Sequence, residues 1–270
     1  MPYPTQKLMF INILHGGQDN RTARILQFVK DESVEFLGLA ELNTWNKQEL
    51  QRFGEQIGMP HTYFLYTKHG YHLGVCSRHA FELVSKKTDE LWHHGHIYVN
   101  VKALDISILV THLSPHSSIV RRWEASQILA TWQRQLPLLV LGDLNTLSPL
   151  YASEHTKLEL PGLFASRSPL RKKFLNDDGT IDYLPMKMLL SELHDCGIGT
   201  STPTVPTSLT EDSMHAAPMH LDYALSSIKG GFIATTAVNE DTSTLSDHYP
   251  LVVQRCEKEQ QHRAWKKNEL

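Results

Sequence analysis

The stretch at residues 138–149 (LLVLGDLNTLSP) places a buried strand directly in front of two polar side chains. Residues 138–141 are four consecutive apolar residues, a pattern typical of a strand buried on both faces. Gly142 follows, where we expect the chain to turn sharply, and Asp143 and Asn145 come two positions apart. Residues i and i+2 of an extended chain point to the same side, so the carboxylate and the amide are predicted to lie together. An Asx turn that closes a strand would give the same pattern, and this stretch alone does not separate the two interpretations.

Hydrophobic patterns elsewhere predict a mixed α/β chain. Strands are expected at residues 7–14, 34–40, 61–66, 71–77, 81–85, 91–94, 97–104, 106–112, 220–226, 231–238 and 249–254. Helices are expected at residues 22–30, 47–57, 118–133 and 183–193, with Asn20 and Ser117 or Ser118 as N-caps. The apolar positions of the third helix are Val120, Trp123, Ile128, Leu129 and Trp132. Most of residues 150–218 lack a clear pattern and are predicted to form an ordered loop region.

Composition sets limits on the class of protein. The 270 residues are 41% hydrophobic and 20% charged, and the formal net charge is −3, so no global attraction to nucleic acid or to anionic membranes is expected. We expect one domain over residues 1–256, a charged tail over residues 257–270, and a monomer. Three widely spaced cysteines indicate a reducing compartment, and neither a signal peptide nor a membrane span is visible, so a cytoplasmic location is expected.

Polar side chains interrupt or end the apolar runs in both halves of the chain. Eight of them carry an oxygen or an imidazole, and these are Asn12, Glu41, His112, Asp143, Asn145, Asp222, Asp247 and His248. Hard oxygen ligands of this kind suit Mg²⁺ or Mn²⁺ better than zinc. Carboxylates beside two histidines suit phosphoryl chemistry, in which a metal neutralises a phosphate oxygen, an imidazole stabilises charge and an Asp activates water.

These residues arrive in an order that resembles the endonuclease/exonuclease/phosphatase superfamily, the group of pancreatic-type DNases and neutral sphingomyelinases. The resemblance is carried by Asn12, Glu41, Thr111-His112, Gly142-Asp143-Leu144-Asn145, Leu221-Asp222-Tyr223 and Ser246-Asp247-His248. Uncharacterised bacterial members share further motifs, which stand here at residues 12–17, 71–73, 77–78, 92–93 and 111–115. The resemblance implies a four-layer α/β sandwich of the DNase type, with two mainly antiparallel sheets face to face and helices outside.

The resemblance also implies roles for these residues. Glu41 would bind Mg²⁺, with Asn12 and Asp247 nearby, and Mn²⁺ would substitute. Asp143 would orient or deprotonate the attacking water, and Asn145 would hold a phosphate oxygen. The other implied roles belong to three residues: His248 contacts the phosphate, Asp222 fixes the tautomer of His248, and His112 stabilises charge or donates a proton. His112 stands where the AP endonuclease branch has a tyrosine, which argues against that branch.

Other histidines and basic residues allow more than one interpretation. Following the resemblance, His93 is placed near the substrate phosphate, whereas His94 and His96 fit equally well on the surface of a hairpin. The run at residues 171–173 (RKK) follows the Gly-Asp-Leu-Asn strand and could face the site, although a solvated charge run is the commoner arrangement. The segment at residues 177–182 begins like a calcium loop but lacks the later ligands, so it is interpreted as a turn.

The predicted function is a Mg²⁺-dependent hydrolase that cleaves a phosphodiester or a phosphomonoester by direct attack of an activated water. The substrate could be nucleic acid, although the scattered basic residues give no strong basic surface. A lipid head group or an inositol phosphate is the alternative substrate. A catalytically silent binding protein on the same scaffold would be expected to have lost one of these residues, and none is lost here.

Overall fold

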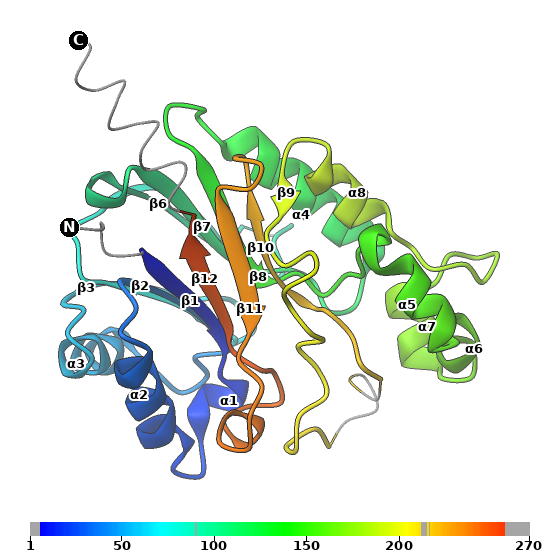
Figure 1. The fold of residues 1–270 in the computed structure, drawn as a ribbon, viewed down its shortest axis with the longest axis horizontal. Helices are drawn as coiled ribbons and strands as arrows, with labels where there is room; N and C mark the ends of the chain where they lie inside the picture. Colours follow the sequence, from blue (N-terminus) through cyan, green and yellow to red (C-terminus); the bar gives the residue numbers. More distant parts are fainter. Residues whose placement is uncertain (1–5, 90, 212–214, 216, 257–270) are drawn as a thin grey trace.

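The strands expected from the apolar runs assemble into two six-stranded sheets (Figure 1). This computed structural model describes residues 6–89, 91–211, 215 and 217–256. The first sheet has the order β11-β12-β1-β2-β4-β3, with β1 (Lys7–Asn12), β2 (Phe36–Ala40), β3 (His61–Leu65), β4 (Leu73–Ser77), β11 (Phe232–Thr236) and β12 (Leu251–Arg255). The second has the order β5-β6-β7-β8-β10-β9, with β5 (Glu82–Lys87), β6 (His96–Val101), β7 (Ile106–His112), β8 (Leu138–Asp143), β9 (His194–Asp195) and β10 (Asp222–Ser226).

Each sheet is antiparallel except for one parallel pair at its centre. β1 runs parallel to β2, and β7 runs parallel to β8, so the carboxyl ends of each pair meet at one edge. In register, His112 lies beside Asp143, and Asp143 lies beside Asp222 at the start of the antiparallel strand β10. In the first sheet Asn12 ends β1 beside Ala40, and Glu41 is the next residue after β2. Hydrogen-bond register therefore brings the polar strand ends to common edges.

Four layers result because each sheet buries both of its faces. The two inner faces pack against each other through Phe10, Val75, Val110 and Leu141, all almost fully buried. The two sheets lie close together at Gly38 of β2, where an added Cβ would lie 2.9 Å from a methyl carbon of Val110 in β7. The outer faces are covered by α2 (Arg21–Glu32) and α3 (Lys47–Gln56) on the first sheet, and by α4 (Ser118–Thr131) and α8 (Leu184–Leu190) on the second (Figure 1). The predicted four-layer α/β sandwich is confirmed.

The strand predicted at residues 91–94 is wrong, because that segment forms turns. Gly95 follows with φ of 87°, and an added Cβ there would lie 2.0 Å from the Lys87 carbonyl oxygen. The predicted loop region at 150–218 also contains regular structure, in α5 (Ala152–Lys157), α6 (Leu160–Ala165), α7 (Ser168–Phe174) and the two residues of β9. These helices bury a small apolar cluster of their own that includes Leu160, Phe164, Leu170 and Phe174.

Local expectations also need correction at three places. The turn predicted at Gly142 is absent, since β8 continues to Asp143. A glycine is needed there because an added Cβ would lie 2.2 Å from the Thr111 carbonyl oxygen of the neighbouring strand. Asn20 precedes α2 in a left-handed conformation without a side-chain cap, whereas Ser117 caps α4 by accepting from the Val120 amide at 3.3 Å. The buried face of α4 includes two charged residues, Arg121 and Glu124, beside Ala125 and Ile128. Of the predicted apolar positions, Ile128 is fully buried, and Trp123, Leu129 and Trp132 are partly buried against the same core cluster.

Other sequence predictions concern segments away from the sheets. Residues 177–180 form the predicted turn, in which Asp178 accepts from the Thr180 amide at 2.9 Å. Within the described parts of the chain, no helix is both long enough and apolar enough to cross a bilayer. The tail predicted at residues 257–270 lies outside the described residues.

Candidate active site

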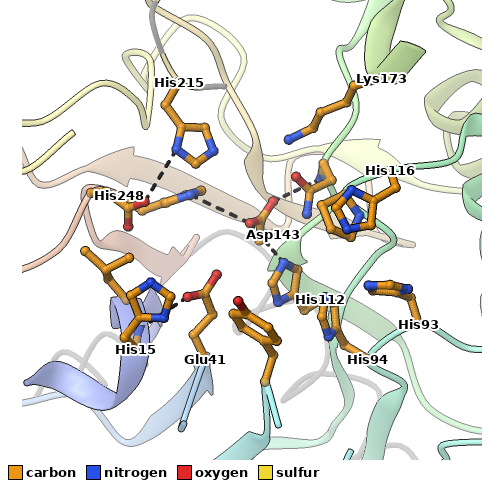
Figure 2. A pocket seen from close by; sticks show the side chains of 15 residues that line it. His15, Glu41, His93, His94, His112, His116, Asp143, Lys173, His215 and His248 are labelled. Carbon is orange, nitrogen blue, oxygen red and sulfur yellow. Dashed lines mark hydrogen bonds and ion pairs between the residues drawn. The ribbon is translucent and has the colours of Figure 1, made fainter. Parts of the chain in front are cut away.

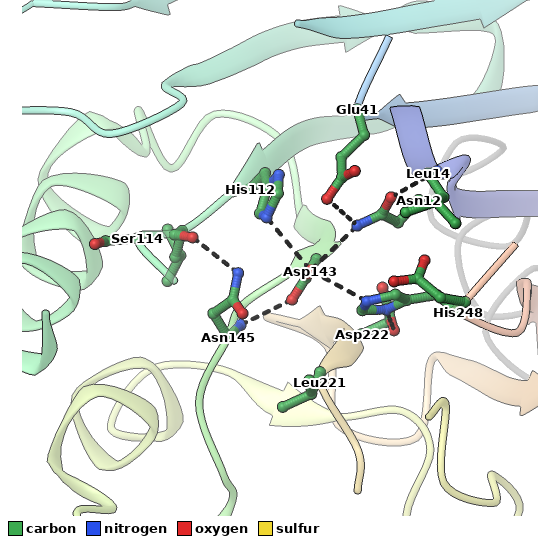
Figure 3. Close-up of polar contacts among 12 residues, drawn as sticks. Asn12, Leu14, Glu41, His112, Ser114, Asp143, Asn145, Leu221, Asp222 and His248 are labelled. Atoms are coloured by element: carbon green, nitrogen blue, oxygen red, sulfur yellow. Dashed lines mark hydrogen bonds and ion pairs between the residues drawn. The ribbon is translucent and has the colours of Figure 1, made fainter. Parts of the chain in front are cut away.

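Asp143 is the centre of the polar strand ends (Figure 3). Its Oδ1 accepts a hydrogen bond from the backbone N–H of Asn145 at 2.9 Å, and this contact forms the Asx turn considered above. Its Oδ2 faces three nitrogen atoms, the Asn12 Nδ2 at 3.3 Å, the His112 Nε2 at 3.4 Å and the His248 Nε2 at 3.8 Å. The turn and the polar cluster are therefore the same structure, with one carboxylate oxygen fixing the turn and the other facing the cluster.

His248 is held by a second carboxylate. Its Nδ1 lies 2.7 Å from the Asp222 Oδ2, and both side chains are almost fully buried. This contact directs the Nε2 atom toward Asp143. Although burial opposes protonation, the carboxylates of Asp222, Asp143 and Asp247 raise the pKa of His248 well above its ordinary value. An imidazolium at His248 therefore offers a charged N–H donor at the centre of the cluster.

His112 is the neutral counterpart of His248. Burial, followed by the charges of His248 and Lys173, lowers the pKa of His112 well below its ordinary value. Its ring stacks on His94, with centroids 4.1 Å apart and an interplanar angle of 24°. His94 and His96 are 2% and 0% exposed, so placing them on a hairpin surface is wrong, because His94 packs on His112 and His96 packs against Trp92. His94 therefore fixes the plane of His112.

Glu41 and Asp247 are two carboxylates that line one cavity beside Asp143. Burial, followed by the charge of Asp247, raises the pKa of Glu41. Among the described residues, neither carboxylate forms an ion pair with a lysine or an arginine, and Asp247 instead contacts the His215 Nδ1 at 3.4 Å. Hard oxygen donors that repel each other and have no lysine or arginine partner fit a divalent cation such as Mg²⁺ or Mn²⁺, which would remove the repulsion.

Distances between possible ligand atoms indicate which side chains could bind such a cation together. Two sets of three side chains in the described residues have ligand atoms within 4.8 Å of one another, namely His215 with Asp247 and His248, and Asp143 with Asp222 and His248. Glu41 belongs to neither set. The predicted ligand Asn12 accepts the Leu14 amide with its Oδ1 at 3.1 Å and donates its Nδ2 to the Glu41 Oε1 at 3.1 Å. Its amide oxygen is thus already engaged by the backbone.

A left-handed turn, α1 (Leu14–Gly17), forms the wall above Glu41. All four residues have positive φ, between 47° and 73°. Such a turn is costly for L-residues, which explains the pair of glycines in the motif at residues 12–17. At Gly16 an added Cβ would lie 2.0 Å from the Asn43 carbonyl oxygen, so only glycine fits. The Gly16 amide donates to the Glu41 carbonyl at 2.7 Å and thereby ties this turn to the candidate ligand.

Arg21 joins that turn to the loop that carries Asp247 and His248. Its guanidinium is 7% exposed and donates to the carbonyls of Ile13 and Leu245 at 2.8 Å each, and to that of Leu14 at 2.7 Å. Glu41 and Asn145 also have left-handed backbones, with φ of 60° and 49°. A left-handed backbone at a non-glycine residue carries a conformational cost, which the surrounding structure must offset.

The cluster opens into a cavity of about 300 Å³ (Figure 2). Its walls carry the predicted residues Glu41, His93, His112, Asp143, Asn145, Asp247 and His248, while Asn12 and Asp222 lie behind them. The walls also carry residues that the sequence did not single out as site residues, which are Leu14, His15, Tyr71, His94, Pro115, His116, Lys173 and His215. A cavity of this size suits a small ligand or one terminal group of a larger one.

A buried Arg121–Glu124 pair on α4 holds two of the cavity walls in place. Glu124 accepts the amides of His93 at 3.0 Å and Ser114 at 2.9 Å. Arg121 donates to the Ser114 carbonyl at 2.8 Å and to the Lys173 carbonyl. Burial raises the pKa of Glu124 to about 7, although both amides favour its ionised form. One helical turn of α4 therefore fixes the loops that carry His93 and His116 and the last turn of α7, which carries Lys173.

Replacing Arg121 with methionine is expected to destabilise the chain by about 3 kcal/mol. The methionine fills similar space, but two buried carbonyls lose their donor and Glu124 loses the nearest positive charge. Urea unfolding of both proteins at one pH measures the difference. The control is Arg52→Met at an exposed position, expected to change stability by less than about 0.5 kcal/mol. A loss below about 1 kcal/mol in Arg121→Met would contradict the assigned role.

Comparison with known proteins adds an independent line of information. The family model described as Endonuclease/Exonuclease/phosphatase family matches residues 9–248. Among curated proteins, none matches the chain. Similar solved structures include a 3′ phosphatase from Neisseria bound to a product DNA hairpin, with 14% identity, coverage of 93% of this chain and 99% of that chain, and a TM-score of 0.65.

Two further structures resemble this chain over nearly their whole length. An AP endonuclease from Archaeoglobus fulgidus shares 15% identity over 92% of this chain and 98% of that chain, with a TM-score of 0.63. A mannosyl-6-phosphatase from Bacteroides thetaiotaomicron shares 14% identity over 92% and 98%, with a TM-score of 0.53. At these identities the likeness shows a common fold.

Proposed function

This chain belongs to the endonuclease/exonuclease/phosphatase family, and from that premise we propose that it is a divalent-metal-dependent hydrolase of phosphate esters. The observation that supports this most strongly is the convergence of Glu41, Asp247 and Asp143 on one small cavity that also contains His112 and His248. Carboxylates for a cation, a carboxylate free to accept a proton and two imidazoles together meet the needs of phosphoryl transfer to water.

In this proposal Glu41 and Asp247 hold Mg²⁺ or Mn²⁺. A bound cation supplies positive charge that offsets the negative charge developing on the phosphate oxygens. Asn12 is proposed as a spacer, since it donates to both Glu41 and Asp143 and keeps the two carboxylates apart. The His215 imidazole beside Asp247 is a softer donor than a carboxylate, which is the reason to test Mn²⁺ together with Mg²⁺.

The proposed chemistry uses Asp143 as the base. Asp143 lines the cavity, where its carboxylate accepts a proton from the attacking water while the bond from phosphorus to the ester oxygen breaks. The departing oxygen takes a proton from solvent and leaves as the alcohol, and Asp143 returns its proton to solvent. His248, kept protonated by the surrounding carboxylates, donates from Nε2 to a phosphate oxygen. His112 provides a neutral imidazole on the other side of Asp143, and Asn145 lines the cavity beside them.

Substrate identity is not decided by the similar structures. By their names they act as an AP endonuclease, a 3′ phosphatase and a mannosyl-6-phosphatase, so they span nucleic acid and sugar phosphates. Both a phosphodiester and a phosphomonoester remain within the proposal, as do lipid head groups and inositol phosphates. The small cavity favours a substrate, or a terminal group, that enters as a single unit.

Metal removal tests the proposal directly. Hydrolysis of p-nitrophenyl phosphate and of bis-p-nitrophenyl phosphate is measured with Mg²⁺, with Mn²⁺ and with EDTA. We expect EDTA to reduce the rate on the better substrate by about 10²-fold or more, because the phosphate charge is then no longer offset. Returning the metal in excess should restore the rate. Equal rates in EDTA and in either metal would overturn the metal-dependent mechanism.

A further inference from the structure

Lys173 is a buried lysine that the roles proposed above leave without a function. It lies in the last turn of α7, is 2% exposed and lines the cavity. Its neighbours Arg171 and Lys172 are exposed, so the basic run at residues 171–173 divides between solvent and site. Burying a lysine is costly, so a lysine at the wall of a cavity invites the question of what its charge does there.

The position of Lys173 is fixed from outside the catalytic cluster. Its carbonyl accepts from Arg121, which also binds the Ser114 carbonyl two residues beyond His112. Its Nζ lies 5.0 Å from the centre of the Phe174 ring. Arg121 therefore holds the backbone of Lys173 in a fixed position relative to the segment that follows His112.

Lys173 brings a positive charge to the wall of the cavity. Among the described residues that line the cavity, Lys173 is the one lysine or arginine. Figure 2 shows it reaching into the pocket from the side opposite Glu41. Its charge contributes to the lowered pKa of His112, which lines the same cavity. A phosphate held between Glu41 and His112 would thus meet the cation site on one side and Lys173 on the other.

A positive charge at Lys173, in addition to the proposed cation, would favour the binding of a phosphomonoester. A phosphomonoester carries close to two negative charges at neutral pH, whereas a phosphodiester carries one and replaces the other anionic oxygen with an alkyl or aryl arm. We propose that the Lys173 ammonium binds the additional anionic oxygen of a phosphomonoester, and that this chain therefore hydrolyses monoesters in preference to diesters. The inference rests on the proposed function and names the substrate class of the same site.

The test compares Lys173→Met with the matched control Lys172→Met, which removes the adjacent exposed lysine. Values of kcat/KM are measured with Mn²⁺ for p-nitrophenyl phosphate and for bis-p-nitrophenyl phosphate. For Lys173→Met we expect a loss of about 10- to 100-fold on the monoester and of less than about 3-fold on the diester, the range of one charge-assisted hydrogen bond. Lys172→Met should match the wild type on both.

A binding measurement separates this inference from the proposed function. Titration calorimetry with inorganic phosphate, in the presence of Mn²⁺, should show affinity about 10-fold or more weaker in Lys173→Met than in the wild type. Equal losses on both esters, or unchanged phosphate affinity with a lowered Tm, would assign Lys173 a structural role and overturn the inference. If the wild type hydrolyses neither ester, the proposed function fails, and the phosphate titration alone then decides the role of Lys173.

Discussion

Replacing Asp143 with asparagine is expected to reduce phosphate-ester hydrolysis by about 10³-fold or more and to leave the fold intact. Asparagine keeps the shape of the side chain, and its oxygen still accepts the Asn145 amide that forms the turn. It has no carboxylate to take a proton from water, and general-base catalysis contributes about 10²- to 10⁴-fold. The measurement is kcat on the better of the two nitrophenyl esters at saturating Mn²⁺.

The control for this change is Asp177→Asn, at an exposed position in the turn between α7 and α8. It should retain wild-type kcat. A second readout separates loss of the base from loss of the cation. Because Glu41 and Asp247 are the proposed ligands, the Mn²⁺-induced rise in Tm should be retained in Asp143→Asn. Retained hydrolysis would refute the base role, and a lost Tm shift would move Asp143 into the set of metal ligands.

Strand ends made most of this cluster predictable from sequence. Asp143, His112 and Asp222 come together because β7, β8 and β10 are neighbours in register, and register follows from where the apolar runs stop. Glu41 reaches the same cavity because the two sheets pack with their polar ends on one side. An apolar run that ends in a carboxylate or an imidazole is visible in sequence, which explains why these positions were found.

Lys173 and the Arg121–Glu124 pair are harder to predict from sequence, because they lie on helices and share a face with apolar residues. Lys173 shares a face with Leu170 and Phe174, at spacings of three and one. The pair stands on the same face of α4 as Ala125 and Ile128. A charged residue on an apolar helical face is indistinguishable from a solvated one until the opposing surface is known. His215 stands among small and apolar residues (SMHAAPM, residues 213–219) that form no strand or helix pattern in the sequence.

Short helices and turns limited the prediction of the fold as well. α6 and α7 have six and seven residues, too few for a hydrophobic period to repeat. The segment at residues 91–94 was predicted as a strand from its large apolar residues, yet Trp92 is buried at a turn against α4, where it lies 5.5 Å from the Trp123 ring. Tertiary packing overrode local preference at this place.

Replacing Glu41 with glutamine is expected to have opposite effects on stability with and without metal, together with a loss of activity of at least about 10²-fold. In the metal-free protein, burial and the neighbouring Asp247 raise the pKa of Glu41, so its ionised form is unfavourable. Glutamine removes that charge, and in EDTA at pH 8 the Tm should rise by about 2–4 °C, which corresponds to about 1 kcal/mol for a chain of this size. With Mn²⁺ the wild type should gain Tm and the variant should not.

The pH dependence of Tm, measured in EDTA for the wild type and for Glu41→Gln, tests whether the pKa of Glu41 is raised in the folded protein. A carboxyl group whose pKa is raised by folding binds more protons in the folded state, so its contribution to stability is present at low pH and is lost as pH rises through the raised pKa. Glutamine does not titrate. In EDTA the wild type should therefore equal Glu41→Gln in Tm near pH 4 and fall below it toward pH 8. A constant difference across this range, or a variant that still gains Tm with Mn²⁺, would show that Glu41 is not the carboxylate that a cation neutralises.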